Sequence, residues 1–263
     1  MIIPQWPAPD NVKALATERE LAGSPLRGVS QSPYQSFNLG DHVNDDPLHV
    51  ESNRQKLLNN AQGCDEIRWL QQVHGIDCPE VASISNGQIA DASVTQHAGL
   101  ACAVMTADCL PVLFCDLQGR QVAAAHAGWK GLAQGVLSKT LKTFSDNGIP
   151  ANQVIAWLGP AISQKAFEVG PEMKAAFSVH PDGSPWADRQ CFSVGIGDRW
   201  QANIYQLARL QLEKLGIDGV YGGESSGCTY NDLDENGESR FFSYRREAIT
   251  GRQASLIWMT NIR

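Results

Sequence analysis

The sequence has neither a long apolar run nor a cluster of basic residues. Its most apolar stretch, residues 99–115, is interrupted by Asp108 and Pro111, whereas a membrane-spanning helix needs about 20 apolar residues. The chain carries 21 lysine and arginine residues against 28 acidic residues, so its formal net charge is −7 at pH 7. Because no basic patch is available to bind a phosphate backbone, we expect neither membrane insertion nor nucleic-acid binding.

Paired cysteines are also missing. The seven cysteines are odd in number and scattered, and no CxxC motif occurs, so a disulfide framework is not expected. The first ten residues lack the basic start and the apolar centre of a secretory signal. We therefore expect a protein of the reducing cytoplasm.

Neither a GxGxxG nor a GxxxxGK[ST] motif occurs, which excludes the Rossmann and P-loop interpretations. The sequence also has no internal repeat and no linker long enough to separate two domains. Hydrophobic residues make up 43% of the 263 residues, which is enough to bury a core. We expect a single domain, residues 1–263, in which strands and helices alternate.

Three helices are predicted from their caps and apolar spacing. Asp46, followed by a proline, is a typical N-cap for a helix that extends to about Ala61. Apolar residues at helical spacing predict a second helix over residues 130–144 and a third that is capped by Asp198 and ends before Gly216. Short apolar runs predict strands over residues 100–106, 111–115, 121–126, 154–158 and 255–259. Residues 180–189 have the composition of an exposed loop.

Three short motifs each place a metal-binding side chain after an apolar run and close to a turn residue. They are Gln72-Val73-His74-Gly75, Thr106-Ala107-Asp108-Cys109-Leu110-Pro111 and Ala125-His126-Ala127-Gly128-Trp129. Clefts open at strand ends of this kind. Two histidines and one cysteine form the ligand set of a catalytic zinc site, which keeps a fourth position for water and lowers the pKa of that water to about 7. His74, Cys109 and His126 are therefore candidate metal ligands.

Each of these residues also has an ordinary structural interpretation. A histidine at a strand end is commonly a hydrogen-bonded structural residue, and a free cysteine such as Cys109 commonly packs as a small buried hydrophobe. The spacing along the chain does not by itself show that the three residues converge. The segment Gly128-Trp129-Lys130-Gly131 leaves a second question open. It either binds an anion through backbone N–H groups and the charge of Lys130, or it only forms a turn.

Further motifs complete a pattern that extends from about Thr17 to Met259. They are Ser32-Pro-Tyr-Gln-Ser-Phe-Asn38-Leu39-Gly40-Asp-His42, Asn53-Arg54, Leu158-Gly-Pro-Ala-Ile-Ser163, Phe167-Glu-Val-Gly170, Gly227-Cys228-Thr-Tyr230 and Phe241-Phe-Ser-Tyr-Arg245-Arg246. Together with the three motifs above, this pattern resembles the YfiH family, also called the polyphenol oxidase or laccase-domain family.

The resemblance implies a layered α/β sandwich, of the mixed α+β kind, in which β-sheets are flanked by helices. It also implies a zinc site whose ligands correspond to His74, Cys109 and His126. Members of the family are described as purine nucleoside enzymes that phosphorolyse adenosine, inosine, guanosine and methylthioadenosine and that deaminate adenosine. Older descriptions call them copper-dependent polyphenol oxidases, and related bacterial proteins are linked to the editing of peptidoglycan precursors. The resemblance thus implies a purine nucleoside and phosphate as substrates.

The histidine count argues against one of these activities. A multicopper oxidase needs many further histidines, usually in HxH pairs, and this chain has six histidines and no HxH. A single copper ion in the His–Cys–His set stays possible, because this set is also a blue-copper geometry. A cysteine hydrolase with Cys109 as nucleophile and His74 or His126 as base is a further alternative. A non-enzymatic module with a structural zinc is disfavoured, because such sites usually have four protein ligands.

Further residues are candidates for contacts with the substrate or with phosphate: Asn38, Arg54, Lys130, Cys228 and Arg245. The basic residues Arg54 and Lys130 are the candidate phosphate ligands, and Asn38 is a candidate polar contact. Cys228 and Arg245 are candidates for lining the same cleft, although Cys228 is equally well explained by packing. Deamination would need a proton shuttle, and Asp108 next to Cys109 is not expected to reach, because neighbouring strand residues point to opposite faces. A monomer and a small homo-oligomer are both compatible with the sequence.

Overall fold

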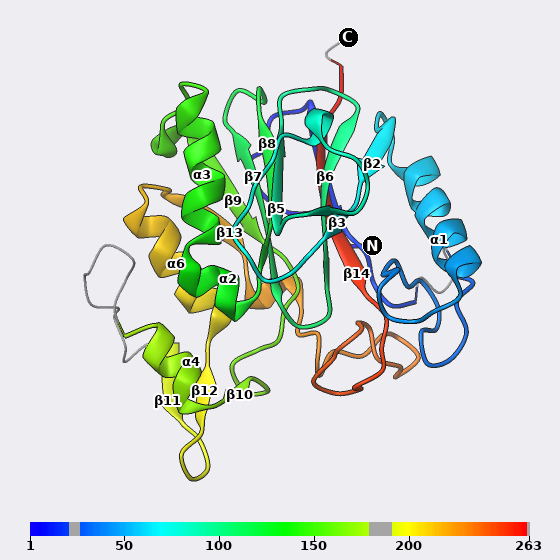
Figure 1. The fold of residues 1–263 in the computed structure, drawn as a ribbon, viewed down its shortest axis with the longest axis vertical. Coiled ribbons are helices and arrows are strands. Elements are labelled where there is room, and N and C mark those ends of the chain that lie inside the picture. The colour runs from blue at the N-terminus through cyan, green and yellow to red at the C-terminus, as the bar shows by residue number, and fades with distance from the viewer. Residues whose placement is uncertain (21–26, 179–190, 262–263) are drawn as a thin grey trace.

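The computed structural model describes residues 1–20, 27–178 and 191–261, and two β-sheets packed face to face form its centre (Figure 1). The strands are β1 (Val12–Ala16), β2 (Glu66–Arg68), β3 (Leu70–Gln71), β4 (Gln88–Ile89), β5 (Ala92–Thr95), β6 (Leu100–Thr106), β7 (Leu110–Asp116), β8 (Val122–Ala127), β9 (Val154–Leu158), β10 (Glu168–Val169), β11 (Phe192–Val194), β12 (Trp200–Ala202), β13 (Gly219–Gly222) and β14 (Gln253–Met259). The helices are α1 (Pro47–Asn60), α2 (Trp129–Gln134), α3 (Val136–Asp146), α4 (Pro171–Ala176) and α6 (Ile204–Lys214).

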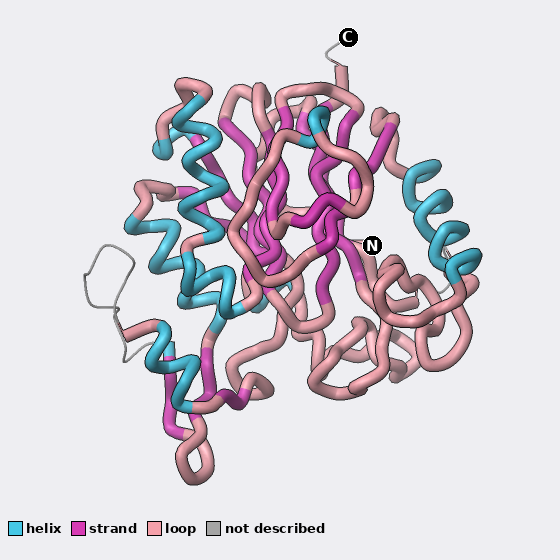
Figure 2. The backbone as a smooth tube through the Cα atoms, viewed as in Figure 1, coloured by secondary structure: helices cyan, strands magenta, loops and turns pink. Residues whose placement is uncertain are grey.

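The larger sheet has the strand order β13-β9-β7-β8-β5, and the other has the order β1-β14-β6-β2. The pairs β13–β9 and β2–β6 are parallel, whereas the remaining pairs in these two sheets are antiparallel. A small sheet β10-β12-β11 and a short β3-β4 ladder lie outside them. Figure 2 shows that long loops, rather than helices, gather at the lower end of the two sheets.

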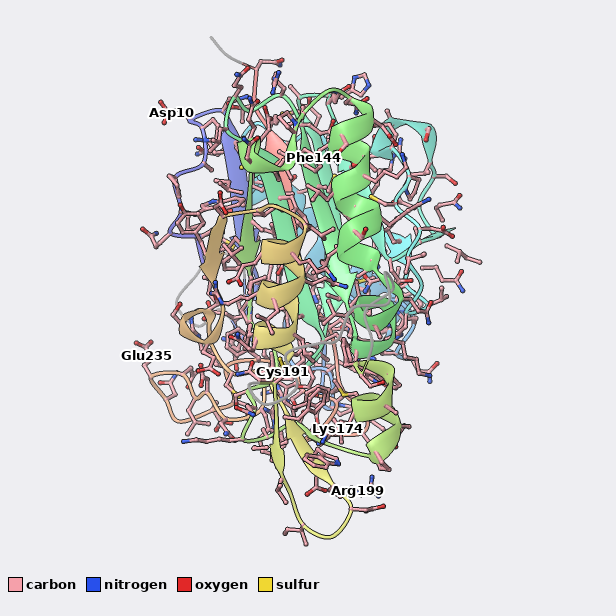
Figure 3. The ribbon with its side chains drawn as sticks, turned by 90° about the vertical axis from the view of Figure 1, so that its left-hand side faces the viewer. Asp10, Phe144, Lys174, Cys191, Arg199 and Glu235 are labelled. Atoms are coloured by element: carbon pink, nitrogen blue, oxygen red, sulfur yellow. The ribbon has the colours of Figure 1, made fainter. Side chains whose placement is uncertain are left out.

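The layers follow from the face of each strand that its apolar residues occupy. In β7, Val112 and Phe114 belong to the core shared with α3 and α6, whereas Leu113 and Cys115 belong to the core between the two sheets. Residues of β6 alternate in the same way between that inter-sheet core and a third core under α1. Burial of both strand faces explains why these strands read as continuous apolar runs. The prediction of a mixed α/β fold with helices flanking β-sheets is confirmed, and Figure 3 looks onto the layer formed by α3 and α6.

The segment predicted as one helix over residues 130–144 forms two helices. Gly135 has φ +97° and separates α2 from α3, and its N–H group donates to the carbonyls of Gly131 and Leu132. The apolar spacing remains helical across this break, because both helices bury residues against the same core. The spacing therefore predicted the helical conformation correctly but not the turn between the two helices.

The predicted cap of the third helix is wrong, whereas that of the first is confirmed. Asn203, not Asp198, is the N-cap of α6, and its side chain accepts a hydrogen bond from the backbone N–H of Gln206 at 2.9 Å. Strand β12 occupies the residues between Asp198 and the helix, and such a short strand leaves little periodic signal. In α1, the Asp46 side chain accepts from the N–H of Leu48, as predicted for an N-cap.

The remaining sequence expectations have different outcomes. The strands predicted over five apolar runs correspond to β6, β7, β8, β9 and β14. The loop expected at residues 180–189 lies outside the described residues, and the interpretation of residues 1–263 as one domain stays a prediction. None of the seven cysteines takes part in a disulfide bond. In the described part of the chain, no helix combines the length and the apolar character needed to cross a membrane.

Candidate metal centre

The three candidate ligands meet because the strands that carry them are neighbours in the fold. Cys109 directly precedes β7, and His126 lies near the end of β8, which pairs with β7 so that Pro111 lies opposite His126. His74 follows β3 and approaches the same point from a loop. The potential ligand atoms of the three residues lie within 4.8 Å of one another, and His74 Nε2 lies 3.7 Å from Cys109 Sγ. The open question of convergence is thereby answered.

The backbone at this point adopts a conformation that non-glycine residues rarely take. His74 has φ 62° and Asp108, the residue before Cys109, has φ 98°. Such conformations cost about 1–3 kcal/mol each and are concentrated at functional sites. The carboxylate of Asp108 accepts a hydrogen bond from the Thr229 hydroxyl at 2.7 Å and another from the backbone N–H of Arg245 at 2.7 Å. The group of possible metal ligands consists of His74, Cys109 and His126, and Asp108 lies outside it.

Gly128 allows the chain to pass close to two of the candidate ligands. A Cβ atom at this position would lie 2.5 Å from His74 Cδ2 and 3.2 Å from Cys109 Sγ. A side chain here would therefore push the imidazole or the thiol out of place. The glycine predicted to belong to a turn thus also leaves room for the ligands.

The geometry fits a divalent metal ion such as zinc. With Zn–S near 2.3 Å and Zn–N near 2.0–2.1 Å, tetrahedral coordination separates the sulfur and nitrogen ligands by about 3.6 Å, close to the 3.7 Å between Cys109 Sγ and His74 Nε2. His126 is buried, Cys109 is half-buried and His74 is exposed. A site with three protein ligands and one open side has the form of a catalytic site rather than a structural one.

Charge in the centre favours the ligand form of the cysteine. Burial raises the pKa of the Cys109 thiol, but the positive charge of His126 and hydrogen bonds from His126 and His74 outweigh burial and lower this pKa to about 6. Burial lowers the pKa of His126, but the charge of Cys109 and the hydrogen bond to Asp91 outweigh it and raise this pKa to about 9. At neutral pH, Cys109 is therefore a thiolate, the state that binds metals.

Comparison with known proteins identifies the family. A family model described as multi-copper polyphenol oxidoreductase laccase matches residues 22–260. The chain belongs to this laccase family. The resemblance stated from the sequence motifs is thereby confirmed.

Relatives of this laccase-family chain carry a different functional name. The chain is 45% identical over 260 residues to the purine nucleoside phosphorylase YfiH of Escherichia coli (strain K12), with 98% of each chain covered. It is 46% identical over 261 residues to the purine nucleoside phosphorylase PA4543 of Pseudomonas aeruginosa, again with 98% of each covered. The crystal structure of Neisseria meningitidis protein NMB0706 superposes with a TM-score of 0.85 at 44% identity and covers 99% of both chains.

A pocket of about 150 Å³ adjoins the centre of this laccase-family chain. It is lined by Ala107, Asp108, Cys109, Trp129, Ile162, Phe167, Ile204, Tyr244 and Arg245. Three aromatic residues, two isoleucines, Arg245 and Asp108 thus line the space beside Cys109. A larger pocket of about 400 Å³ lies between the N-terminal residues and β1. None of the three candidate ligands lines that larger pocket, so the smaller one is the better candidate for substrate binding.

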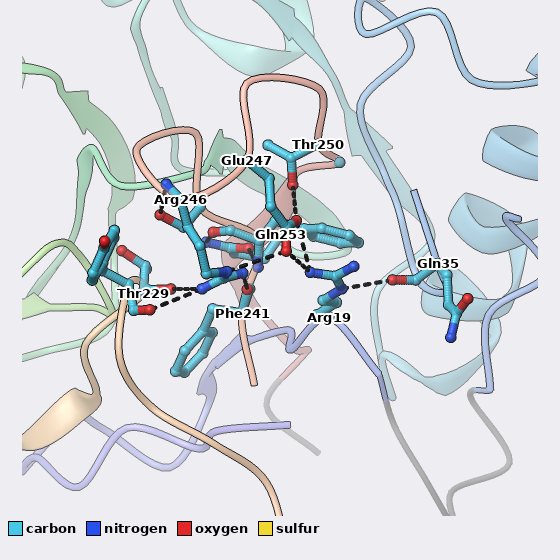
Figure 4. Close-up of polar contacts among 12 residues, drawn as sticks. Arg19, Gln35, Thr229, Phe241, Arg246, Glu247, Thr250 and Gln253 are labelled. Carbon is cyan, nitrogen blue, oxygen red and sulfur yellow. Dashed lines mark hydrogen bonds and ion pairs between the residues drawn. The ribbon is translucent and has the colours of Figure 1, made fainter. Parts of the chain in front are cut away.

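The loop that carries Tyr244 and Arg245 is anchored by a network of charged groups (Figure 4). Glu247 forms an ion pair with Arg19 at 2.8 Å and accepts a hydrogen bond from Arg246 at 3.2 Å. The guanidinium of Arg246 also donates to three backbone carbonyls, those of Thr229, Tyr230 and Phe241. These contacts hold one wall of the pocket to neighbouring loop segments, at Arg19, at Thr229 and Tyr230, and at Phe241.

Two of the residues predicted to contact substrate are fully engaged elsewhere. Asn38 is buried, and its amide donates to the Gly40 carbonyl and the Asp45 carboxylate while its oxygen accepts from two backbone N–H groups. Arg54 donates to the Leu39 carbonyl, pairs with Asp41 at 3.3 Å and lies over the Trp69 ring at 4.4 Å. Neither residue lines the pocket beside Cys109.

The other three predicted contacts lie closer to the centre. Arg245 lines the pocket, lies over the Phe167 ring at 5.6 Å and donates to the Ala166 carbonyl. Lys130 is exposed next to Trp129 and does not line the pocket. Cys228 is half-buried, and its thiol lies 3.2 Å from the Ser163 hydroxyl. Of the five, the structure brings only Arg245 into the pocket.

Sequence reasoning missed Asp91 entirely. This fully buried aspartate directly precedes β5, and its carboxylate is bonded to the imidazole of His126 and to the backbone around His74. A buried aspartate that follows a short apolar segment gives little signal in a single sequence. Aromatic residues of the pocket wall, such as Phe167, were noted only as parts of family motifs.

Proposed function

We propose that this chain is a metal-dependent purine nucleoside phosphorylase that holds zinc at His74, Cys109 and His126. The observation that carries the proposal is the convergence of these three ligands beside an aromatic pocket. The names of the relatives at 45% and 46% identity support the same activity. The family resemblance extends the proposal to adenosine, inosine, guanosine and methylthioadenosine, and to deamination of adenosine.

The pocket chemistry suits a purine nucleoside. Trp129, Phe167 and Tyr244 offer ring faces on which a flat base can stack. Arg245 places a permanent positive charge at the same wall, where it would attract phosphate. Ile162 and Ile204 complete an apolar lining that would exclude water.

Phosphorolysis breaks the bond between the sugar carbon and the base nitrogen and forms a bond from that carbon to an oxygen of hydrogen phosphate, whose proton passes to the base nitrogen. Arg245 would hold the phosphate, and the aromatic walls would hold the base, so that both reactants lie beside Cys109. Exclusion of water protects the sugar from hydrolysis in place of phosphorolysis. A zinc ion bound by the three ligands would supply a Lewis acid to polarise an oxygen atom and would lower the pKa of water to about 7.

A second candidate function, a cysteine hydrolase, is favoured by one specific observation. Asp91, His126 and Cys109 follow one another in the order of an orienting group, a base and a nucleophile, and the pKa of Cys109 is about 6. An amide substrate such as a peptidoglycan precursor would suit this arrangement. A copper oxidase is supported less, because the three ligands form the only candidate metal cluster among the described residues. The trinuclear centre of a multicopper enzyme has no counterpart there.

Metal analysis and a turnover assay test the proposal. We expect about one zinc per chain in the wild type and much less in Cys109→Ser, with Cys64→Ser as the control because Cys64 packs in the α1 core away from the pocket. We expect release of free base from inosine only with phosphate, and loss of this activity in chelator with recovery on adding zinc. Ammonia release from adenosine tests the deaminase part. Activity that resists chelator but not a thiol alkylator would contradict the metal mechanism and favour the hydrolase.

The proposed partners are small molecules, a purine nucleoside and phosphate. The lack of a disulfide bond among the seven cysteines supports the predicted reducing, cytoplasmic setting. The oligomeric state, a monomer or a small homo-oligomer, stays a prediction.

A further inference from the structure

We propose that Asp91 is a positioning residue that sets the metal affinity of the centre by holding two of its three ligands at once. This inference rests on the proposed metal site but concerns a residue outside the ligand set. Asp91 is fully buried and lies directly before β5, beside the end of β8 that carries His126, because Ala92 pairs with Ala125.

Both oxygens of the Asp91 carboxylate are fully used. Oδ1 accepts from His126 Nδ1 at 2.8 Å and from the backbone N–H of His74 at 2.9 Å. Oδ2 accepts from the backbone N–H groups of Val73 at 3.1 Å and Gly75 at 2.6 Å. One carboxylate therefore joins the imidazole of one ligand to the backbone on both sides of another.

The contact with His126 fixes which ring nitrogen carries the proton. An ionised carboxylate only accepts hydrogen bonds, so the neutral, metal-binding form of His126 keeps its hydrogen on Nδ1 and directs the lone pair of Nε2 to the centre. The backbone carbonyl of Asp91 also accepts from the N–H of His126 at 2.7 Å, which holds the residue as well as its ring. A carboxylate bonded in this way also raises the basicity of a metal-binding histidine.

The contacts with the 73–75 loop have a different effect. His74 has a positive φ, a conformation that is unfavourable unless its surroundings hold it in place. Three consecutive N–H groups that converge on one carboxylate supply that restraint. Without it, the loop would relax and the imidazole of His74, which is otherwise exposed to solvent, would lose its orientation.

The negative charge of Asp91 also balances the centre. A divalent ion bound by two neutral imidazoles and one thiolate has a net charge of +1. The buried Asp91 carboxylate, which is hydrogen-bonded to the ligand His126, brings the total charge to zero. Because buried charge is costly unless it is compensated, this balance should strengthen metal binding. The pKa of Asp91 is lowered, because hydrogen bonds and charge from His126 and the N–H groups of Gly75 and Val73 outweigh its burial.

The test is the affinity for Co²⁺ and Zn²⁺ in Asp91→Asn, measured by titration of the apoprotein and by the absorption bands of bound Co²⁺. An asparagine keeps the shape of the side chain but turns one acceptor into a donor. If the NH₂ group takes the place of Oδ2, it faces the N–H groups of Val73 and Gly75, which lose their acceptor. If it takes the place of Oδ1, His126 must move its proton from Nδ1 to Nε2. We expect metal affinity to fall about 10–100-fold and the Co²⁺ bands to shift.

Asp116 offers a matched control. It is also fully buried, and its carboxylate likewise accepts four hydrogen bonds, from the N–H groups of Gln118, Arg120 and Gln121 and from the Arg120 side chain. It lies at the opposite end of β7 from Cys109. Asp116→Asn should lower the melting temperature but leave the metal affinity and the Co²⁺ spectrum unchanged.

Two further variants keep the inference falsifiable. If Asp91→Asn does not fold, Asp91→Glu and Asp116→Glu form the test pair. Asp91→Glu keeps the charge on a longer arm, so we expect partial recovery, with an affinity between those of the wild type and Asp91→Asn. Unchanged metal affinity in folded Asp91 variants would overturn the positioning role. The proposed metal site itself would be overturned if the wild type bound neither ion. It would also be overturned if Cys109→Ser bound the ions as tightly as the wild type does.

Discussion

The backbone of Gly128 lies against the imidazole of His74, so that a Cβ atom at position 128 would lie 2.5 Å from His74 Cδ2. We therefore expect Gly128→Ala to displace His74 and to lower metal affinity and turnover at least tenfold. Gly87→Ala is the control, because Gly87 has a positive φ but open space around it. It should cost about 1 kcal/mol of stability without affecting the metal. Equal metal content in both variants, measured after dialysis, would contradict the steric argument.

Arg245→Ala tests the anion contact in the pocket. The hydrogen bond from Arg245 to Asp108 uses the backbone N–H, so it survives this substitution. We expect the KM for phosphate to rise at least tenfold, because a hydrogen bond to a charged group contributes about 1.5–3 kcal/mol and about 1.4 kcal/mol is a factor of ten. Arg199→Ala, which removes an exposed arginine outside the pocket, should leave this KM within twofold. Steady-state kinetics with varied phosphate gives both values.

Arg54→Lys separates a structural role from phosphate binding. The guanidinium of Arg54 already pairs with Asp41 and lies over Trp69, and lysine cannot reproduce these planar contacts. We expect a lower melting temperature and an unchanged KM for phosphate. A raised KM in a protein of normal stability would support the phosphate contact predicted from the sequence.

Glu247→Gln tests the pH dependence of the anchored loop. Burial raises the pKa of Glu247, but the hydrogen bonds and charges of Arg19 and Arg246 outweigh it and lower this pKa below its ordinary 4.5. A lowered pKa in the folded state stabilises the protein above pH 4.5, and this contribution is lost as pH falls through the folded value.

Because the pair is partly exposed, we expect the wild type to exceed Glu247→Gln by only about 1 kcal/mol at pH 7. Denaturant unfolding at several pH values gives this difference. It should stay constant above about pH 5.5 and narrow below pH 4.5. A difference that does not change down to pH 3 would show that the charge of Glu247 does not contribute.

The sequence indicated the three residues that converge in the structure better than it indicated their surroundings. His74, Cys109 and His126 each stand at a strand end beside a turn residue, so local patterns were enough to find them. Asp91 is joined to His126 only through space, across 35 positions of the chain, and no local pattern reports such a contact.

Charged residues were predicted least well. Arg54 has polar neighbours in the sequence of its helix, which indicate an exposed side chain. In the fold, however, its guanidinium lies over Trp69 and pairs with Asp41. Whether an arginine is free to bind a ligand depends on residues that are distant in sequence. Strands fared better, because burial on both faces leaves a continuous apolar run.

Strand β7 contributes alternate side chains to two separate cores and begins directly after Cys109, a residue of the candidate metal centre. If either the helical layer or the second sheet detached, the apolar face of β7 that it covers would be exposed to water. Because Cys109 directly precedes β7, loss of either layer would displace its side chain. We therefore expect the centre to persist until the whole structure unfolds cooperatively. Loss of the Cys109 thiolate environment would then report global unfolding rather than local opening.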